Sequence, residues 1–342
     1  MNLQVKHYPL HFKRPSGTSR GIMQVKNSWI IQIWRDETPE IKGTGECSVI
    51  EGLSPDYISI EQYEAAILEA FQKWKTLGFT SNVDFLSNYP SIQFGFETAL
   101  LDLKNGGKGI MFNNAFHQGE LKIPINGLIW MGSPEFMQEQ IREKIADGYT
   151  TIKMKIGAID FETELNLLQS IREKFSDKEI TLRVDANGAF SPEEAWEKLE
   201  KLAQFDIHSI EQPIKAGQWE AMAKLCKNSK VPIALDEELI GVNDRKQKIN
   251  LLETIQPDYI ILKPSLHGGI SGTQEWIDLA EAKRIPWWMT SALESNIGLN
   301  AICQLTAEYP NSLPQGLGTG SLYSNNIPLD LIVEQGYIYC KK

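Results

Sequence analysis

The chain has 342 residues, 42% of them hydrophobic and 23% charged, which suits a globular protein with room for two domains. The formal net charge of −10 argues against nucleic-acid binding, which needs a basic surface, and no apolar run approaches the ~20 residues that span a bilayer. The four cysteines form no CxxC pair and the N-terminus has no signal-peptide core, so we expect reduced thiols, a cytoplasmic protein and no zinc site.

Residues 1–120 predict an α+β domain. The runs SWIIQIW (28–34) and GTGECSVI (43–50) have the composition of antiparallel strands, and helical patterns follow near 59–77 and 91–104. We interpret this part as a capping domain.

From about residue 120, short β-rich runs recur at intervals of roughly 25 to 30 residues, the length of one βα unit. These runs are KIPING (122–127), TTIKMKIG (150–157), ITLRVDANG (180–188), IHSIEQPI (207–214), VPIALDEEL (231–239), DYIILKPS (258–265), IPWWMTSALES (285–295) and SLPQGLGTG (312–320). An open doubly wound sheet is the alternative, but it usually has fewer strands and a glycine-rich first turn.

Helices are predicted between these strands. In SPEEAWEKLEKLAQF (191–205), Ser191 is the expected N-cap and Glu194 completes a capping box, and SPEFMQEQIREKIADG (133–148) opens in the same way. The alternation predicts an α/β fold, a modified TIM (β/α) barrel over residues 121–320. The tail, 321–342, is expected to pack on the capping domain.

Two lysines interrupt the apolar pattern of TTIKMKIG. Ile152, Met154 and Ile156 alternate with Lys153 and Lys155, which is the period of a β-strand. Both ammonium groups would therefore point to the opposite face, into the barrel. The later strands also end in polar groups, which are Asp185 and Asn187, Glu211, Asp236 and Glu237, Lys263, and Ser291 and Glu294. Barrel active sites form at these carboxyl ends.

Three acids on consecutive strands predict a metal site. The carboxylates of Asp185, Glu211 and Asp236 would lie side by side and repel one another. A divalent cation relieves that repulsion, and ligation by oxygen alone favours Mg²⁺ or Mn²⁺. The alternative is a ring of solvated acids at the mouth of the barrel.

The lysines predict acid–base chemistry. Lys155 and Lys263 would face each other across the metal site. Burial, the neighbouring Lys153 and a dication would each lower a lysine pKa from its usual value of about 10.4. A metal with an amine base suits the removal of a proton α to a carboxylate. Simple salt bridges to the barrel acids are the alternative interpretation.

As a set, these motifs resemble the enolase superfamily in its muconate-lactonizing subgroup. Those that carry the resemblance are Lys153-Met154-Lys155, Asp185-Ala186-Asn187, Glu211-Gln212-Pro213, Asp236-Glu237 and KPSLHGG (263–269). Within the subgroup, the chain most resembles the o-succinylbenzoate synthase family. The segments that carry this resemblance are GECSVIEGLSPD (45–56), SALESNIGLNA (291–301) and QGLGTGSLYSNN (315–326).

This resemblance implies a Mg²⁺-dependent lyase of menaquinone biosynthesis. It would dehydrate 2-succinyl-6-hydroxy-2,4-cyclohexadiene-1-carboxylate in the syn sense, with Lys155 as the base. Lys263 would be an electrostatic partner and Lys153 would hold the substrate carboxylate. The metal ligands implied are Asp185, Glu211 and Asp236.

Substrate contacts are expected from the rim of the barrel. The glycine- and serine-rich segment KRPSGTSRGI (13–22) predicts a mobile loop over the mouth, closing beside IEGLSPD (50–56). The candidate contact residues are Asn187, Ser291, Glu294, Arg20, Gly318 and Thr319. For Arg20 the alternative is a solvated loop arginine, and for the glycine cluster it is a tight turn.

Other functions on the same scaffold stay open at this point. An N-acylamino acid racemase or dipeptide epimerase would use both Lys155 and Lys263 as bases, and a cycloisomerase is a third possibility. Dipeptide epimerases typically carry Asp-x-Asp where this chain has Gly318-Thr319-Gly320, which argues against a cationic substrate. A catalytically silent barrel would be expected to lose a lysine or a metal acid. The partner expected is a small carboxylate, and homo-oligomers are common among such barrels.

Overall fold

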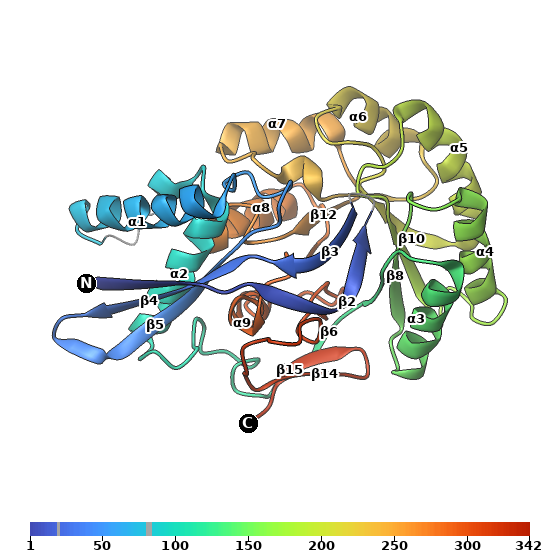
Figure 1. Ribbon diagram of the computed structural model, residues 1–342. Helices are drawn as coiled ribbons and strands as arrows, with labels where there is room; N and C mark the ends of the chain where they lie inside the picture. Colours follow the sequence, from blue (N-terminus) through green and yellow to red (C-terminus); the bar gives the residue numbers. More distant parts are fainter. Residues whose placement is uncertain (19–20, 80–83) are drawn as a thin grey trace.

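The computed structural model describes residues 1–18, 21–79 and 84–342 and consists of a capping domain, a barrel and a terminal hairpin (Figure 1). The capping sheet has the order β1-β4-β5, all antiparallel. Its elements are β1 (Asn2–His7), β4 (Ser28–Arg35), β5 (Thr38–Ser48), α1 (Ile60–Thr76), the 3₁₀ turn Asp84–Leu86 and α2 (Pro90–Lys104). The α+β organisation expected for this part is therefore present.

Helix α2 packs unusually close to β5, because glycines face each other there. A Cβ on Gly45 would lie 2.0 Å from the backbone oxygen of Gly95, and a Cβ on Gly95 would meet Cys47 Sγ. The close contact lets α2 pass between the capping sheet and the barrel helix α8.

The barrel is a curled parallel sheet of seven strands in the order β13-β12-β11-β10-β9-β8-β7. Single parallel bridges, Ile125 with Gln315 and Thr290 with Gly316, connect its two edges through residues 315–316. The seven strands are β7 (Gly127–Ile129), β8 (Thr151–Lys155), β9 (Thr181–Asp185), β10 (Ile207–Glu211), β11 (Ile233–Leu235), β12 (Tyr259–Leu262) and β13 (Trp287–Met289), and the short β6 (Ile123–Pro124) before them belongs to another sheet. The predicted modified TIM barrel is confirmed.

Helices cover the outside of this sheet. They are α3 (Pro134–Ala146), α4 (Phe161–Arg172), α5 (Pro192–Leu202), α6 (Trp219–Asn228), α7 (Arg245–Ile255), α8 (Gly269–Ala282) and α9 (Asn296–Thr306), with 3₁₀ turns at Ala203–Phe205 and Glu237–Leu239. Ser133 caps α3, and Ser191 forms the predicted capping box with Glu194 at the start of α5. None of the described helices is both long enough and apolar enough to cross a membrane.

The segment before β4 differs from the expected mobile loop. Strands β2 (Leu10–Thr18) and β3 (Gly21–Lys26) pair as an antiparallel hairpin, which runs from the capping sheet to the mouth of the barrel (Figure 1). Serine and glycine in this segment suggested a loop, but the hairpin is supported by contacts distant in sequence, such as the backbone hydrogen bond from Lys13 N to Leu322 O.

The C-terminal tail has two different neighbours. Asn325 hydrogen-bonds with Tyr8 and His11 at the N-terminal side, in line with the expected packing on the capping domain. The terminal hairpin of β14 (Leu331–Glu334) and β15 (Tyr337–Cys340) instead pairs with β6 at the start of the barrel. Sequence alone did not indicate this pairing.

Candidate active site

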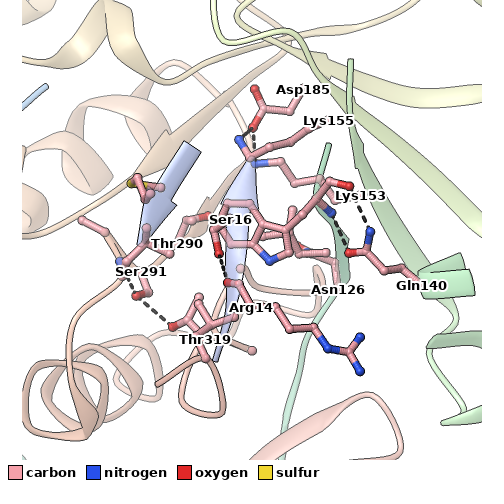
Figure 2. A pocket seen from close by; sticks show the side chains of 18 of the residues that line it. Arg14, Ser16, Asn126, Gln140, Lys153, Lys155, Asp185, Thr290, Ser291 and Thr319 are labelled. Carbon is pink, nitrogen blue, oxygen red and sulfur yellow. Dashed lines mark hydrogen bonds and ion pairs between the residues drawn. The ribbon is translucent and has the colours of Figure 1, made fainter. Parts of the chain in front are cut away.

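A cavity of about 400 Å³ opens at the carboxyl ends of the barrel strands, below the β2–β3 hairpin (Figure 2). Its charged lining is mainly cationic, with Lys13, Arg14, Lys144, Lys153, Lys155 and Lys263 against Glu51, Glu143 and Asp185. Apolar side chains of the hairpin and of the loop after β5 complete the wall, among them Ile22, Met23 and Leu53. The cavity therefore suits an anionic molecule with an apolar body.

Strand β8 places two lysines on the inner face of the barrel. All five of its residues are buried, and Lys153 and Lys155 are only 6% and 7% exposed. Lys155 pairs in register with Asp185 on β9. Its Nζ donates to Asp185 Oδ2 at 2.9 Å and to Asn187 Oδ1 at 2.7 Å (Figure 2). The inward orientation predicted from the strand period is confirmed.

The other two acids lie among the same ammonium groups. Lys153 Nζ contacts Asp185 Oδ2 at 2.9 Å and also Glu211, and Lys263 Nζ is paired with Asp236 and lies 3.9 Å from Glu211. Glu211 thus stands between two lysines from opposite parts of the barrel. Strands β9, β10 and β11 are neighbours, which is why the three carboxylates converge.

Burial and charge act in opposite directions on these groups. Burial lowers the pKa of Lys153 and of Lys263, but carboxylates nearby, Asp185 for Lys153 and Asp236 for Lys263, outweigh it and raise both values. Burial alone would raise the pKa of Asp185, but Lys153 and Lys155 hold it below its usual range. The pKa of Glu211 is raised, first by burial and then by the negative charge of Asp185.

The donor set fits a hard divalent cation. Within the part of the chain that the structure describes, Glu211 Oε1 and Asp236 Oδ1 are buried and accept no hydrogen bond, whereas Glu211 Oε2 is paired with Lys153. Oxygen ligands of this kind suit Mg²⁺ or Mn²⁺. Among the described residues, no three acidic, His or Cys side chains are placed around one point, because Lys153 Nζ lies between Asp185 and Glu211. The ion pairs also match the salt-bridge alternative, so the ligand assignment stays a prediction.

Two strained residues orient the strand ends. Asn187 has φ 46° and Gln212 has φ 40°, in the left-handed backbone region that residues other than glycine rarely adopt. Asn187 accepts from Lys155 and donates to Glu237 Oε1 at 3.0 Å. Gln212 accepts from the backbone N–H of Asp236 at 3.3 Å, which ties the end of β10 to the end of β11. The strain thus occurs where the acids and Lys155 are positioned.

The opposite wall contains Ser291 and Thr319, both lining the cavity (Figure 2). Ser291 Oγ donates to Glu294 Oε2 at 2.7 Å and accepts from Thr319 Oγ1 at 3.0 Å. Gly318 also lines the cavity. Glu294 is 0% exposed and accepts from Ser265 Oγ as well, so the expected contact with substrate is wrong for Glu294, which lies behind Ser291.

Arg20 lies outside the described residues. Another arginine, Arg14 on β2, lines the cavity, with Nη1 3.9 Å from Glu143 Oε2 on α3. The sequence did not single out Arg14.

Sequence reasoning missed two groups of site residues. Asn126, directly before β7, and Trp130, directly after it, line the cavity. The KIPING run could have indicated Asn126, because this residue follows the short strand β6. The other is His267, fully buried, whose Nδ1 accepts from the backbone N–H of Lys263 at 2.9 Å. Burial lowers the pKa of His267 to about 3, so the ring is a neutral acceptor.

Comparisons with known proteins agree with this geometry. Residues 136–341 match the family model described as enolase C-terminal domain-like. The chain belongs to the enolase superfamily. It is 45% identical to o-succinylbenzoate synthase of Desulfotalea psychrophila, over 99% of this chain and 98% of the relative. The crystal structure of MenC from that organism has a TM-score of 0.84, at 43% identity and 99% coverage of both chains. A D-Ala-D/L-Ala epimerase of Cytophaga hutchinsonii is 30% identical, over 87% of this chain and 81% of the relative.

Proposed function

We propose that the chain catalyses the o-succinylbenzoate synthase reaction, the dehydration of 2-succinyl-6-hydroxy-2,4-cyclohexadiene-1-carboxylate to 2-succinylbenzoate in menaquinone biosynthesis. The observation that carries the proposal is the full-length similarity to the Desulfotalea enzyme. The cationic lining of the cavity supports it, because the substrate carries two carboxylates. The protein is accordingly a carbon–oxygen lyase, and its four unpaired cysteines suit a cytoplasmic location.

Lys155 Nζ is the proposed base. It removes the proton α to the ring carboxylate; the electron pair of that C–H bond becomes a ring double bond as the C–O bond to the hydroxyl breaks. The ammonium group of Lys155 then protonates the departing hydroxide, which leaves as water. Asn187 holds Lys155 in position through its 2.7 Å hydrogen bond. Lys263 provides positive charge from the other side of the substrate, and Lys153 binds the carboxylate.

Asp185, Glu211 and Asp236 are the proposed ligands of a Mg²⁺ ion, with Mn²⁺ as the alternative. The buried Glu211 Oε1 and Asp236 Oδ1, which accept no hydrogen bond from the described residues, support this assignment. A bound divalent cation would supply positive charge that stabilises the negative charge developing on the substrate carboxylate.

The test follows the ultraviolet absorbance of the cyclohexadiene acid. We expect turnover in Mg²⁺, its loss after chelation, and a fall of about 10²–10⁴-fold in kcat for Lys155→Ala. Lys230→Ala, which removes an exposed surface lysine, is the control and should match the unaltered protein. An unaltered protein that leaves this substrate untouched would refute the proposal.

N-acylamino acid racemisation is the second candidate, because lysines on two sides, Lys155 and Lys263, could each move an α-proton. Deuterium exchange at the α-carbon of N-acylamino acids discriminates between the two. Racemisation would require both lysines, whereas the dehydration requires proton transfer by Lys155 alone.

A further inference from the structure

A buried lysine lies at the base of the hairpin that covers the site. Lys26 ends β3, whose other end contributes Gly21, Ile22 and Met23 to the cavity wall. Lys26 is only 3% exposed. Within the described residues its hydrogen bonds go to hydroxyl groups, at 3.4 Å to Ser28 Oγ and also to Ser48 Oγ. A buried ammonium group that hydrogen-bonds to hydroxyls needs a negative charge close by.

The first such charge is Glu46, on β5 of the capping domain. Ser28 Oγ, which accepts from Lys26, donates to Glu46 Oε1 at 2.7 Å. Glu46 also accepts from the N–H of Ser295 at 2.9 Å and from the N–H of Gly298 at 2.9 Å, at the N-terminus of α9. A carboxylate of the capping domain thus caps a barrel helix.

The second charge is Glu294, directly behind the wall of the active site. It accepts from Ser265 Oγ at 2.6 Å, two residues after Lys263, and from Ser291 Oγ at 2.7 Å. Burial lowers the pKa of Lys26, and Glu46 and Glu294 oppose that shift. Burial raises the pKa of Glu294, with Glu46 adding to the rise and Lys26 opposing it.

We propose that Lys26 is a positioning residue: its charge allows Glu46 and Glu294 to accept hydrogen bonds together, and thereby joins the hairpin base to Ser291 in the cavity wall. The inference rests on the proposed function and adds to it a determinant of substrate binding. Without Lys26, two buried carboxylates would face each other with no cation between them. Glu294 would then gain a proton, and one of its hydrogen bonds, to Ser291 or Ser265, would have to reverse direction.

The test compares kcat and KM for the dehydration. In Lys26→Met we expect KM to rise about tenfold, the effect of losing one buried hydrogen bond in the wall, while kcat stays within about threefold because Lys155 and Asn187 are unchanged. In Lys26→Arg the positive charge is kept, so KM should stay within about threefold of the original value. Glu294→Gln places an amide where Lys26→Met would leave a protonated carboxyl, so one hydrogen bond reverses there too and KM should rise as in Lys26→Met.

Lys248→Met is the matched control. Lys248 is buried at 2% exposure and pairs with Glu275 at 2.8 Å, between α7 and α8. Its loss should lower the melting temperature and leave KM unchanged. If Lys26→Met fails to fold, a tenfold rise of KM in Glu294→Gln together with an unchanged KM in Lys26→Arg supports the proposal, and an unchanged KM in Glu294→Gln overturns it.

Two results contradict the role of Lys26: an unchanged KM in Lys26→Met, or a rise of KM in Lys26→Arg equal to that in Lys26→Met. A failure of the proposed function is a separate result, since the unaltered protein would then not dehydrate the cyclohexadiene acid. The same comparison of KM and kcat, made on α-proton exchange of N-acylamino acids, would in that case decide the role of Lys26.

Discussion

At the scale of single residues, the proposed base, Lys155, is positioned by one amide. Asn187 accepts from Lys155 and donates to Glu237, and its left-handed backbone turns the side chain toward both. An asparagine tolerates this backbone conformation better than most residues do. The residue type is therefore required by the backbone as well as by the hydrogen bonds.

Asn187→Ala should lower kcat by about tenfold and leave the fold intact, because it removes one hydrogen bond to the base and adds moderate backbone strain. Steady-state kinetics with a circular dichroism spectrum measure both quantities. The loss should be smaller than that of Lys155→Ala. Equal losses in the two variants would mean that Asn187 itself takes part in the proton transfer.

Ile22 is exposed and also borders the site, at 72% exposure in the hairpin. Ile22→Ser should raise KM by about three- to tenfold with kcat nearly unchanged, because less apolar surface would be covered on substrate binding. Val25→Ser is the control, since Val25 is 48% exposed on the same strand but does not line the cavity. Equal effects in both variants would indicate a general weakening of the hairpin.

At the scale of elements, helix α2 of the capping domain joins the barrel through one carboxylate. Glu97 accepts from the N–H and the hydroxyl of Ser271 and from the N–H of Ile270, at the start of α8. Helix α8 follows the loop that carries Lys263 and His267. The capping domain is therefore connected to the strand end that bears one of the active-site lysines.

This contact predicts a pH dependence of stability. Burial raises the pKa of Glu97 to about 7, above the value of about 4.3 in an unfolded chain. The folded state thus binds the proton more tightly, so the stability that Glu97 contributes is present at low pH and is lost as the pH rises through about 7.

Relative to Glu97→Gln, the free energy of unfolding of the unaltered protein should fall between pH 5 and pH 8, by at most about 3 kcal/mol. Urea denaturation of both proteins at pH 5, 6, 7 and 8 measures the difference. If the difference in the free energy of unfolding between the two proteins stays constant across this pH range, the raised pKa of Glu97 is contradicted.

At the scale of the whole molecule, metal binding should couple to folding, because the carboxylates on β9, β10 and β11 come together only in the closed barrel. An ion that binds the native state alone stabilises it by about 2.7 kcal/mol at 100 times its dissociation constant. Added Mg²⁺ should therefore raise the melting temperature of the unaltered protein. Asp236→Asn should reduce the rise, whereas Asp160→Asn, at the exposed N-cap of α4, should keep it. No change of the melting temperature with Mg²⁺ would contradict the ligand assignment.

The sequence alone determined the strand–helix order, the inward orientation of Lys153 and Lys155, and the acids at the strand ends. These features are local: a period of two orients a strand residue, and a residue at a strand end lies at the mouth of a parallel barrel. The N-caps Ser133 and Ser191 could be predicted for the same reason.

Only the tertiary structure decided which side chains touch. Glu294 looked like a substrate contact, but Ser265 and Ser291 occupy its oxygens behind the wall. The segment 13–22 looked like a loop, yet its described residues pair as antiparallel strands, and Lys13 also bonds to Leu322, which is distant in the chain. Lys26 and Glu46 gave no local signal, because their partners come from strands and helices far apart in sequence. The direction of a pKa shift also depends on such partners: burial alone lowers a lysine pKa, and the acids that the barrel brings to Lys263 raise it.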